Sequence, residues 1–389
     1  MARKLTMGSL FDGSGGFPLG GLMAGITPVW ASEIEPFPIR VTTKRLPFMK
    51  HYGDISQMDG GKIEPVDIIC FGSPCTDLSV AGRRAGLAGQ QSSLFYQAIR
   101  IINEMRCATN GRCPRWICWE NVPGAFSSNS GRDFQEVLNS IIGVIEPSAK
   151  VPSTEKGRWP SADCYLGDRW SVAYRTFDAQ YWGVPQRRKR IFLIADFRGQ
   201  SAWEVLFEPK GLQRADPAHD QSWDDYSANV VGDAANTNGT GKTINSDLIC
   251  LDYASYNQGV NAKYRPGIAY DLSPTLVSSG PNIVLTNCVR RLTPTECSRL
   301  QGFPDWWCSD LGTEDPSEEE IRFWTEVWET HRRIVNPKVK PKTRNQILKW
   351  IKQPHSDAAE YKMWGNGVAL PCVYFVLAGI VWCTQNRGL

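Results

Sequence analysis

The stretch that decides the fold is Val66-Asp67-Ile68-Ile69-Cys70-Phe71, which is followed by Gly72-Ser73-Pro74-Cys75. Its first part is short, largely apolar and β-branched, as is typical of a buried strand in a parallel sheet. Glycine and proline then end the strand, because proline cannot donate to a sheet ladder and glycine relaxes the backbone. Open α/β sheets bind ligands just beyond the carboxyl ends of their strands. We therefore expect Cys75 at the mouth of a site, whereas a lone cysteine in a turn is more often a small hydrophobic residue.

Length and composition limit the classes of protein that this chain can belong to. Its 389 residues are long for a single core, which predicts two or three compact units. Hydrophobic residues make up 42% and charged residues 21%, a balance that excludes general disorder. The formal net charge of +3 is too small to indicate a polyanion partner, so any basic surface has to be local. The 12 cysteines include no Cys-x-x-Cys pair, so no metal site is expected.

The two ends of the chain bear on targeting and on membrane insertion. The start, Met1-Ala2-Arg3-Lys4-Leu5-Thr6, has no long apolar region, so we expect no secretory signal and a cytoplasmic protein. Residues 368–382 are almost entirely apolar, but the segment is shorter than the about 20 residues that span a bilayer. It also contains Pro371 and Gly379. A buried helix and no membrane partner are therefore expected.

Alternation of strands and helices predicts one doubly wound α/β domain with a mostly parallel sheet in residues 1–195. The expected strands are residues 5–11, 29–32, 66–71, 116–119, 172–177 and 191–195, and the expected helices are 19–24, 94–105 and 134–144. Helical periodicity is lost after 196, which predicts a smaller domain of loops and short strands at 196–308. A helical, basic insert at 309–361 and a C-terminal helix at 362–389, returning to the first domain, complete the expected organisation.

Two capping boxes and a basic run mark the region after residue 290. Thr293 with Glu296, and Ser317 with Glu320, each predict the start of a helix. From 332 to 352 there are eight basic residues and no acidic one. Such a run is usually a solvated surface, and the alternative is a non-specific contact with nucleic-acid phosphates.

The first strand ends in the glycine turn Phe11-Asp12-Gly13-Ser14-Gly15-Gly16, a strand–turn–helix arrangement typical of nucleotide sites. The dinucleotide fingerprint fails because Pro18 stands where its third glycine belongs, which argues against a nicotinamide oxidoreductase. Glu33 ends the next strand about 20 residues further on, where an acid can hold a ribose hydroxyl. Asp54 follows Gly53 at the start of a third element. Each acid alone is more often a surface charge, but acids at successive strand ends suggest a ligand site.

A second polar group follows the strand at 116–119, in Glu120-Asn121-Val122-Pro123-Gly124. A thiolate at Cys75 would attack carbon centres, and Arg188 and Arg190 could supply the positive charge that lowers its pKa. A carboxyl group in a closed pocket can stay protonated and donate to a ring nitrogen or oxygen. No histidine lies in these motifs, which argues against a Cys–His hydrolase. This set of groups suits addition to an electron-poor ring.

With these motifs in order, the chain resembles the DNA (cytosine-5) methyltransferases of bacterial or phage type. The resemblance covers the chain except residues 196–287 and 310–361. It rests on six blocks that follow the order of the family: Phe11-Asp12-Gly13-Ser14-Gly15-Gly16, Gly72-Ser73-Pro74-Cys75, Glu120-Asn121-Val122, Gln186-Arg187-Arg188-Lys189-Arg190, Arg291-Leu292-Thr293-Pro294-Thr295-Glu296 with Gln301-Gly302-Phe303-Pro304, and Gly365-Asn366-Gly367-Val368.

The resemblance implies a catalytic role for four residues. Cys75 would add to carbon 6 of a cytosine flipped out of the duplex, and Glu120 would hydrogen-bond or protonate its ring nitrogen 3. Carbon 5 would then take the methyl group of S-adenosylmethionine. Arg188 would hold the base and its adduct, and Arg190 would order the pocket.

The resemblance also implies binding residues. The positions expected to bind S-adenosylmethionine are Phe11, Gly13, Gly15, Glu33, Ile34, Asp54, Leu94 and Asn366. Those expected to bind DNA are Arg83 and Arg84 in the loop after Cys75, and the pair Thr275-Leu276 in a target-recognition domain at 196–308. Ile34 stands where some relatives have tryptophan, and Gly367 where a small polar residue or alanine is common.

The resemblance implies double-stranded DNA as partner, a monomer, and a cognate restriction endonuclease, if there is one, on a separate chain. A tRNA cytosine methyltransferase of the same fold stays open as an alternative, because the sequence alone does not exclude RNA. A catalytically dead DNA-binding relative is disfavoured by the intact Cys75, Glu120, Arg188 and Arg190.

Overall fold

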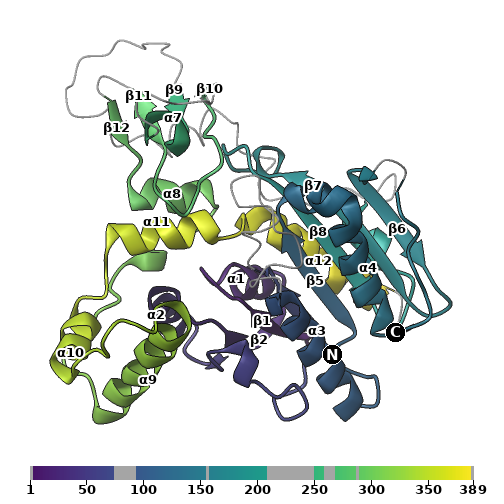
Figure 1. Ribbon diagram of the computed structural model, residues 1–389, viewed down its shortest axis with the longest axis horizontal. Coiled ribbons are helices and arrows are strands. Elements are labelled where there is room, and N and C mark those ends of the chain that lie inside the picture. The colour runs from purple at the N-terminus through teal and green to yellow at the C-terminus, as the bar shows by residue number, and fades with distance from the viewer. Residues whose placement is uncertain are drawn as a thin grey trace.

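The computed structural model describes residues 3–73, 93–154, 157–207, 249–257, 268–285 and 289–386. The molecule has a large sheet with helices on both faces. A smaller sheet lies at the upper left of Figure 1 and a helical insert at the lower left. Three residues expected to act in the site, Cys75, Arg83 and Arg84, lie outside the described ranges.

The large sheet has eight strands in the order β3-β2-β1-β4-β5-β8-β7-β6. Strands β1 to β5 pair in parallel, whereas β5 with β8, β8 with β7 and β7 with β6 are antiparallel. The chain order reverses between β1 and β4, and ligands of open α/β sheets bind at such a point. The strands are β1 (Thr6–Leu10), β2 (Thr27–Ser32), β3 (Lys50–His51), β4 (Ile68–Phe71), β5 (Trp116–Asn121), β6 (Ala162–Leu166), β7 (Ser171–Asp178) and β8 (Lys189–Asp196).

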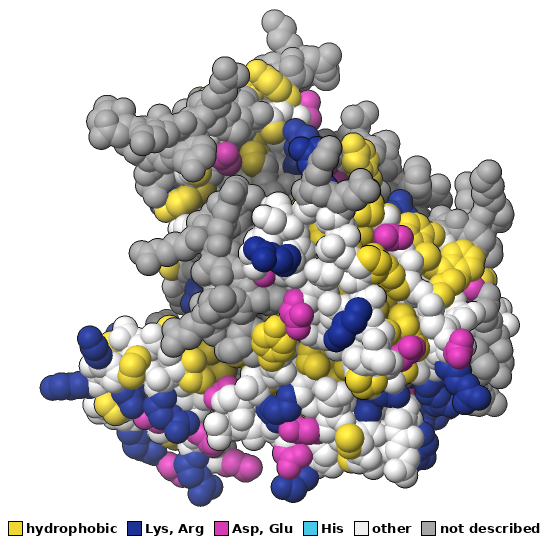
Figure 2. Space-filling model, turned by 45° about the vertical axis from the view of Figure 1, so that its right-hand side comes forward, with side chains coloured by type: hydrophobic (Ala, Val, Ile, Leu, Met, Phe, Trp, Pro, Cys, Tyr) yellow, Lys and Arg dark blue, Asp and Glu magenta, His cyan; other side chains and the backbone are white. Residues whose placement is uncertain are grey.

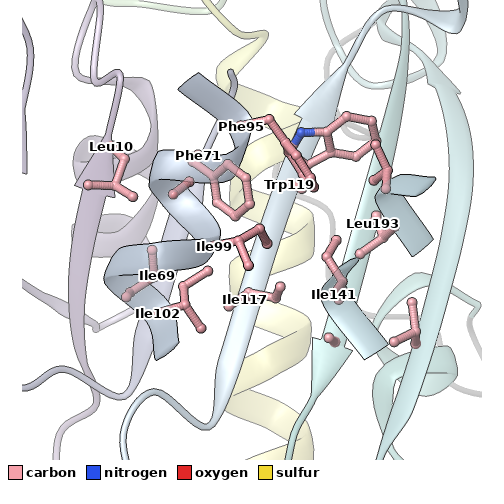
Figure 3. Packing of buried hydrophobic residues seen from close by; sticks show 14 of the residues in the cluster. Leu10, Ile69, Phe71, Phe95, Ile99, Ile102, Ile117, Trp119, Ile141 and Leu193 are labelled. Carbon is pink, nitrogen blue, oxygen red and sulfur yellow. The ribbon is translucent and has the colours of Figure 1, made fainter. Parts of the chain in front are cut away.

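Alternate residues of each strand point to opposite faces of the sheet, and helices bury both faces. Ile69 and Phe71 of β4 pack under α3 (Ser93–Ala108) and α4 (Arg132–Gly143), with Trp119 of β5 beside them (Figure 3). Cys70 of β4 faces the other layer, which consists of α1 (Gly16–Met23), α5 (Ala202–Leu206) and α12 (Leu370–Asn386). The doubly wound α/β architecture expected from the sequence is therefore confirmed.

Two details of the first domain differ from the expectation. Strand β6 was not expected, because it is a short edge strand, interrupted by Asp163 and fully buried at no position, in a stretch whose sequence indicates a connection. The domain also does not end at residue 195. Ala202, Val205 and Leu206 are fully buried in the same core layer as α12, so the chain stays on the large sheet at least to residue 207.

The smaller sheet has the antiparallel order β10-β9-β11-β12, as the expected unit of short strands requires. Its strands are β9 (Ile249–Leu251), β10 (Ile268–Tyr270), β11 (Ile283–Leu285) and β12 (Val289–Arg291), with α7 (Tyr253–Asn257) after β9. Helix α8 (Pro294–Leu300) follows and starts with the predicted capping box of Thr293 and Glu296. Arg290 also pairs with Glu296, at 2.7 Å, and so joins the cap to the sheet.

The insert folds as α9 (Glu318–Val335) and α10 (Arg344–Lys352), and α11 (Asp357–Asn366) leads back toward the large sheet. Ile321 and Trp324 of α9 are buried with Ile347 of α10 against Ile39 of α2 (Pro36–Arg45), so the insert lies beside the first domain (Figure 1). The second capping box is only half formed: the Ser317 side chain accepts from the Glu320 N–H, but the Glu320 carboxylate is bonded elsewhere.

Helix α12 is the apolar C-terminal helix expected from the sequence, and it is largely buried against the sheet. Among the described residues no single helix is long and apolar enough to cross a membrane. Only α11 and α12 taken together, bent by 44° at the break between them, reach that length and composition.

Candidate active site

The glycine turn after β1 forms one wall of the candidate site. Phe11, Gly13 and Gly15 all have positive φ angles, of 56°, 56° and 79°. This left-handed conformation suits glycine, which has no Cβ. A Cβ at Gly15 would also lie 2.8 Å from the Thr42 side chain, so α2 packs directly against the turn.

Glu33 at the end of β2 is tied to this turn. One of its oxygens accepts from the Gly13 N–H at 2.8 Å, and the other accepts from the N–H groups of Ile34 and Glu35 at 2.7 and 2.9 Å. Burial raises the pKa of Glu33, and these backbone donors oppose the rise. The carboxylate is thus fixed in place, and its remaining lone pairs are available to ligand hydroxyl groups.

Asp54 and Glu33 follow neighbouring strands at the same edge of the sheet, because β3 and β2 are paired in parallel. It caps the short 3₁₀ helix Ile55–Gln57, and its carboxylate accepts from Ser56 N at 2.9 Å. The Ser32 hydroxyl donates to the Gly53 carbonyl at 2.7 Å and holds the two strand ends together. Asp54 therefore follows a strand, not starts one as the sequence suggested.

The other expected cofactor positions lie around the same end of the sheet. Phe11 and Leu94 both pack, partly exposed, against the core under α3. Asn366 is the exposed last residue of α11. A Cβ at Gly367 would lie 3.1 Å from Ser14 Oγ, so the residue after Asn366 adjoins the glycine turn and a side chain there would be tightly packed.

Asp12, in the centre of the turn, received no role from the sequence. It is buried, and one of its oxygens accepts from the Ser9 hydroxyl at 2.6 Å. The other oxygen has no hydrogen-bond partner among the described residues, and neither has Ser14 Oγ. Burial, with a smaller contribution from Glu33, raises the pKa of Asp12 to about 8 although the Ser9 bond lowers it. Buried polar atoms without partners beside a glycine turn fit a site for a polar ligand.

Glu120 and Gly72 bring the second half of the site together. A Cβ at Gly72 would lie 3.2 Å from Glu120 Oε2, so the end of β4, three residues before Cys75, adjoins this carboxyl group. Burial raises the pKa of Glu120, while Arg190 and Arg188 lower it. A carboxyl group in this setting can hold a proton and donate it to a bound ring.

The two arginines expected in the site have different neighbours in the structure. Arg190, not Arg188, lies beside Glu120, with 3.1 Å between Nε and Oε1. Phe192 of β8 pairs with Glu120 of β5, and alternate residues of a strand share a face, so Arg190 falls on the side of Glu120. Arg188 precedes β8, where it is buried and donates to the carbonyls of Leu276, Gly365 and Gly367.

The pair Thr275-Leu276 lies beside this arginine. The Thr275 hydroxyl donates to the Arg187 carbonyl, and Leu276 is buried at 2% exposure. The side chain of Leu276 therefore belongs to the core here, which differs from the DNA contact expected of it.

Burial and Arg190 lower the pKa of Arg188, but the ordinary pKa of a guanidinium group is so high that Arg188 stays charged.

The fold and the site define the class of protein. The structure of S. pombe Dnmt2 methyltransferase matches with a TM-score of 0.55 at 14% identity, covering 99% of this chain and all of that one, so the fold is that of a methyltransferase. Residues 5–144 and 166–319 match the model of the C-5 cytosine-specific DNA methylase family. The chain belongs to this family.

Two curated relatives cover nearly the whole chain. A DNA N-6-adenine-methyltransferase of Escherichia phage P1 is 26% identical over 99% of this chain, which spans 62% of the phage protein. The type II methyltransferase M1.ScrFI of Lactococcus lactis subsp. cremoris is 27% identical over 96% of this chain and 77% of its own length.

Proposed function

We propose that this protein is a DNA cytosine-5 methyltransferase that acts through a covalent adduct of Cys75. The observation that carries the proposal is the position of Glu120: a buried carboxyl group with raised pKa, paired with Arg190 and in contact with the strand end that leads to Cys75. Membership of the cytosine-5 methylase family supports the same assignment.

The chemistry assigns complementary roles to the two residues. The Cys75 thiolate forms a bond to carbon 6 of cytosine, and a proton shared with Glu120 keeps negative charge from building up on ring nitrogen 3. The electron pair of the 5,6 double bond thus becomes available at carbon 5, which accepts a methyl group. When carbon 5 loses its proton to a base, the double bond forms again and the thiolate leaves. The cytosine has to be flipped out of the duplex, because the base stack covers both carbons.

S-adenosylmethionine would supply the methyl group as an electrophile. The glycine turn with Phe11, Gly13 and Gly15 fits its adenosine, and Glu33 with Asp54 fits its ribose hydroxyl groups. Ile34 and Leu94 offer apolar walls to the adenine, and Asn366 lies next to the turn. The unpartnered oxygen of Asp12 and the Ser14 hydroxyl match the polar methionine end.

The proposed partner is double-stranded DNA, read by the smaller sheet and its loops, with Thr275 held to the segment of the site arginines by its hydrogen bond to the Arg187 carbonyl. Arg83 and Arg84 remain proposed DNA contacts. We also propose a monomer that acts in the cytoplasm. Type II relatives such as M1.ScrFI suggest a restriction endonuclease on another chain as a further partner.

Nucleoside analysis of DNA tests the proposal directly. DNA from cells that express the chain, and from cells that express Cys75→Ala, is digested and analysed by mass spectrometry, and bisulfite sequencing locates the modified sites. The proposal predicts 5-methylcytosine with the wild type alone. N6-methyladenine, the modification in the name of the phage relative, would overturn it, and methylation of tRNA without methylation of DNA would assign RNA as the substrate.

A further inference from the structure

The insert is fastened to α2 by a buried arginine. Arg40, only 4% exposed, donates to the Leu311 carbonyl at 2.6 Å, to Thr313 Oγ1 at 2.6 Å and to Glu320 Oε1 at 2.7 Å. Its guanidinium group also lies 5.4 Å from the centre of the Trp324 ring. The carboxylate that would have completed the helix cap of α9 is used for this contact, so the insert is built against the first domain.

A second contact falls at the amino end of α2, at Glu35. His331 of α9 lies 3.4 Å from one oxygen of Glu35, and Lys362 of α11 lies 2.7 Å from the other. Burial alone would raise the pKa of Glu35, but His331 and Lys362 bring it down to about 2. Glu35 is therefore ionised at any pH near neutrality and held from two separate helices.

Glu35 belongs to the same turn as the proposed ribose-binding acid. Its N–H donates to Glu33 Oε1 at 2.9 Å, and Glu33 Oε2 accepts from Gly13 of the glycine turn at 2.8 Å. A continuous set of polar contacts thus leads from α9 and α11 through Glu35 and Glu33 to Gly13.

The charges of the insert are partly satisfied within the insert itself. Arg332 pairs with Glu329 at 2.7 Å, Arg344 pairs with Glu318, and the Lys342 ammonium lies 4.2 Å from the centre of the Trp328 ring. On the face drawn in Figure 2, Lys and Arg side chains along the lower margin of the molecule are interspersed with Asp and Glu. Several basic residues of the insert therefore have partners within the insert.

We propose that the insert, together with α11, braces the Glu33–Glu35 turn and makes His331 and Lys362 positioning residues for the nucleoside half of the methyl donor. The inference rests on the proposed function, because it takes Glu33 as the group that binds the ribose. Without the brace the turn at the start of α2 has more freedom, and a ligand has to order it on binding.

Binding measurements without DNA test the brace. Isothermal titration gives the dissociation constant of S-adenosylhomocysteine for the wild type, for His331→Ala and for Arg344→Ala, a matched variant that loses an ion pair within the insert. Exposed and half-exposed pairs each contribute about 0.2–1 kcal/mol, which corresponds to roughly a 1.4- to 5-fold change. We expect His331→Ala to weaken binding by about that factor, and Arg344→Ala to leave it unchanged.

Two further measurements separate positioning from mere stability. 5′-Methylthioadenosine, which carries the nucleoside half alone, should lose the same factor as the full ligand. In a Glu35→Gln background, His331→Ala should have no further effect, because its partner charge is gone. If His331→Ala does not fold, Lys362→Met tests the brace through the other partner of Glu35, on α11.

Unchanged affinity in His331→Ala, or an equal loss in Arg344→Ala, would overturn the brace while leaving the proposed function intact. A wild-type protein that binds no S-adenosylhomocysteine would overturn the proposed function, and the brace with it.

Discussion

Arg190 Nε lies 3.1 Å from Glu120 Oε1, and the pair joins the last parallel strand, β5, to the first antiparallel one, β8. The contact places a positive charge beside a buried carboxyl group whose own pKa is raised. Burial raises the pKa of Glu120, and Arg190 and Arg188 oppose this rise. A carboxyl group under these opposing influences suits the sharing of a proton with a substrate.

Glu120→Gln is expected to slow methyl transfer by roughly 10²–10⁴, the usual contribution of a general acid or base. Affinity for DNA should stay near that of the wild type, because the amide has the same shape and the binding contacts lie elsewhere. Single-turnover rates with a methylatable duplex measure the effect. A rate equal to that of the wild type would mean that another group serves ring nitrogen 3.

Arg188 and Arg190 should respond differently to replacement. Arg188→Ala removes donors from three buried carbonyls that are distant in sequence, so we expect it to lower the free energy of unfolding by roughly 3 kcal/mol. Arg190→Ala should cost less stability and act mainly on the rate, since its partner is Glu120. Urea unfolding and single-turnover kinetics of both variants give the comparison. The reverse order of stability losses would contradict the structure.

Asp12 gives the unliganded protein a dependence of stability on pH. Its pKa is raised from an ordinary 3.8 to about 8, so the folded protein keeps a proton that the unfolded chain releases between about pH 4 and pH 8. The free energy of unfolding should therefore fall as the pH rises through this window. Asp12→Asn cannot ionise, so relative to the wild type it should gain stability at pH 9 and not at pH 4. Parallel urea titrations at the two pH values would refute the assignment if both proteins changed equally.

The boundary of the smaller domain can be tested by exchange. A chimera in which residues 208–287 come from a relative should acquire the target sequence of that relative, as read by bisulfite sequencing. Exchange from residue 196 should instead destabilise the protein, because Ala202, Val205 and Leu206 are buried against the large sheet. An active chimera from 208 with unaltered specificity would place recognition elsewhere.

The central part of the fold could be predicted because its strands are short, apolar and ended by glycine or proline. Strand β4 lies within the expected residues 66–71, and Glu120, expected just after its strand, is the penultimate residue of β5. Strand β6 could not be predicted, since an edge strand with one solvated face has no continuous apolar run. The half-formed cap at Ser317 could not be foreseen either, because Arg40, which takes the Glu320 carboxylate, is distant in sequence.

In the site, too, local sequence predicted some residues, whereas features that depend on distant residues could not be predicted. Motif order predicted site roles for Glu33, Asp54 and Glu120, and the structure places them at or shortly after strand ends. Which arginine faces Glu120 depends on the register of β5 with β8, and a sequence does not state a register. Asp12 was overlooked because its importance comes from burial and a missing partner. Contact of the exposed Lys338 and Lys340 with DNA phosphates remains a prediction.

The most direct test of the central claim is covalent capture at Cys75. A duplex that carries 5-fluorocytosine at the target site is incubated with the protein and S-adenosylmethionine, and the product is digested and mapped by mass spectrometry. Fluorine at carbon 5 cannot leave as the proton does, so the thiolate cannot be expelled after methyl transfer. The account predicts a stable protein–DNA adduct on Cys75 that is absent from Cys75→Ala. No adduct with an active wild-type protein, or an adduct that persists in Cys75→Ala, would contradict it.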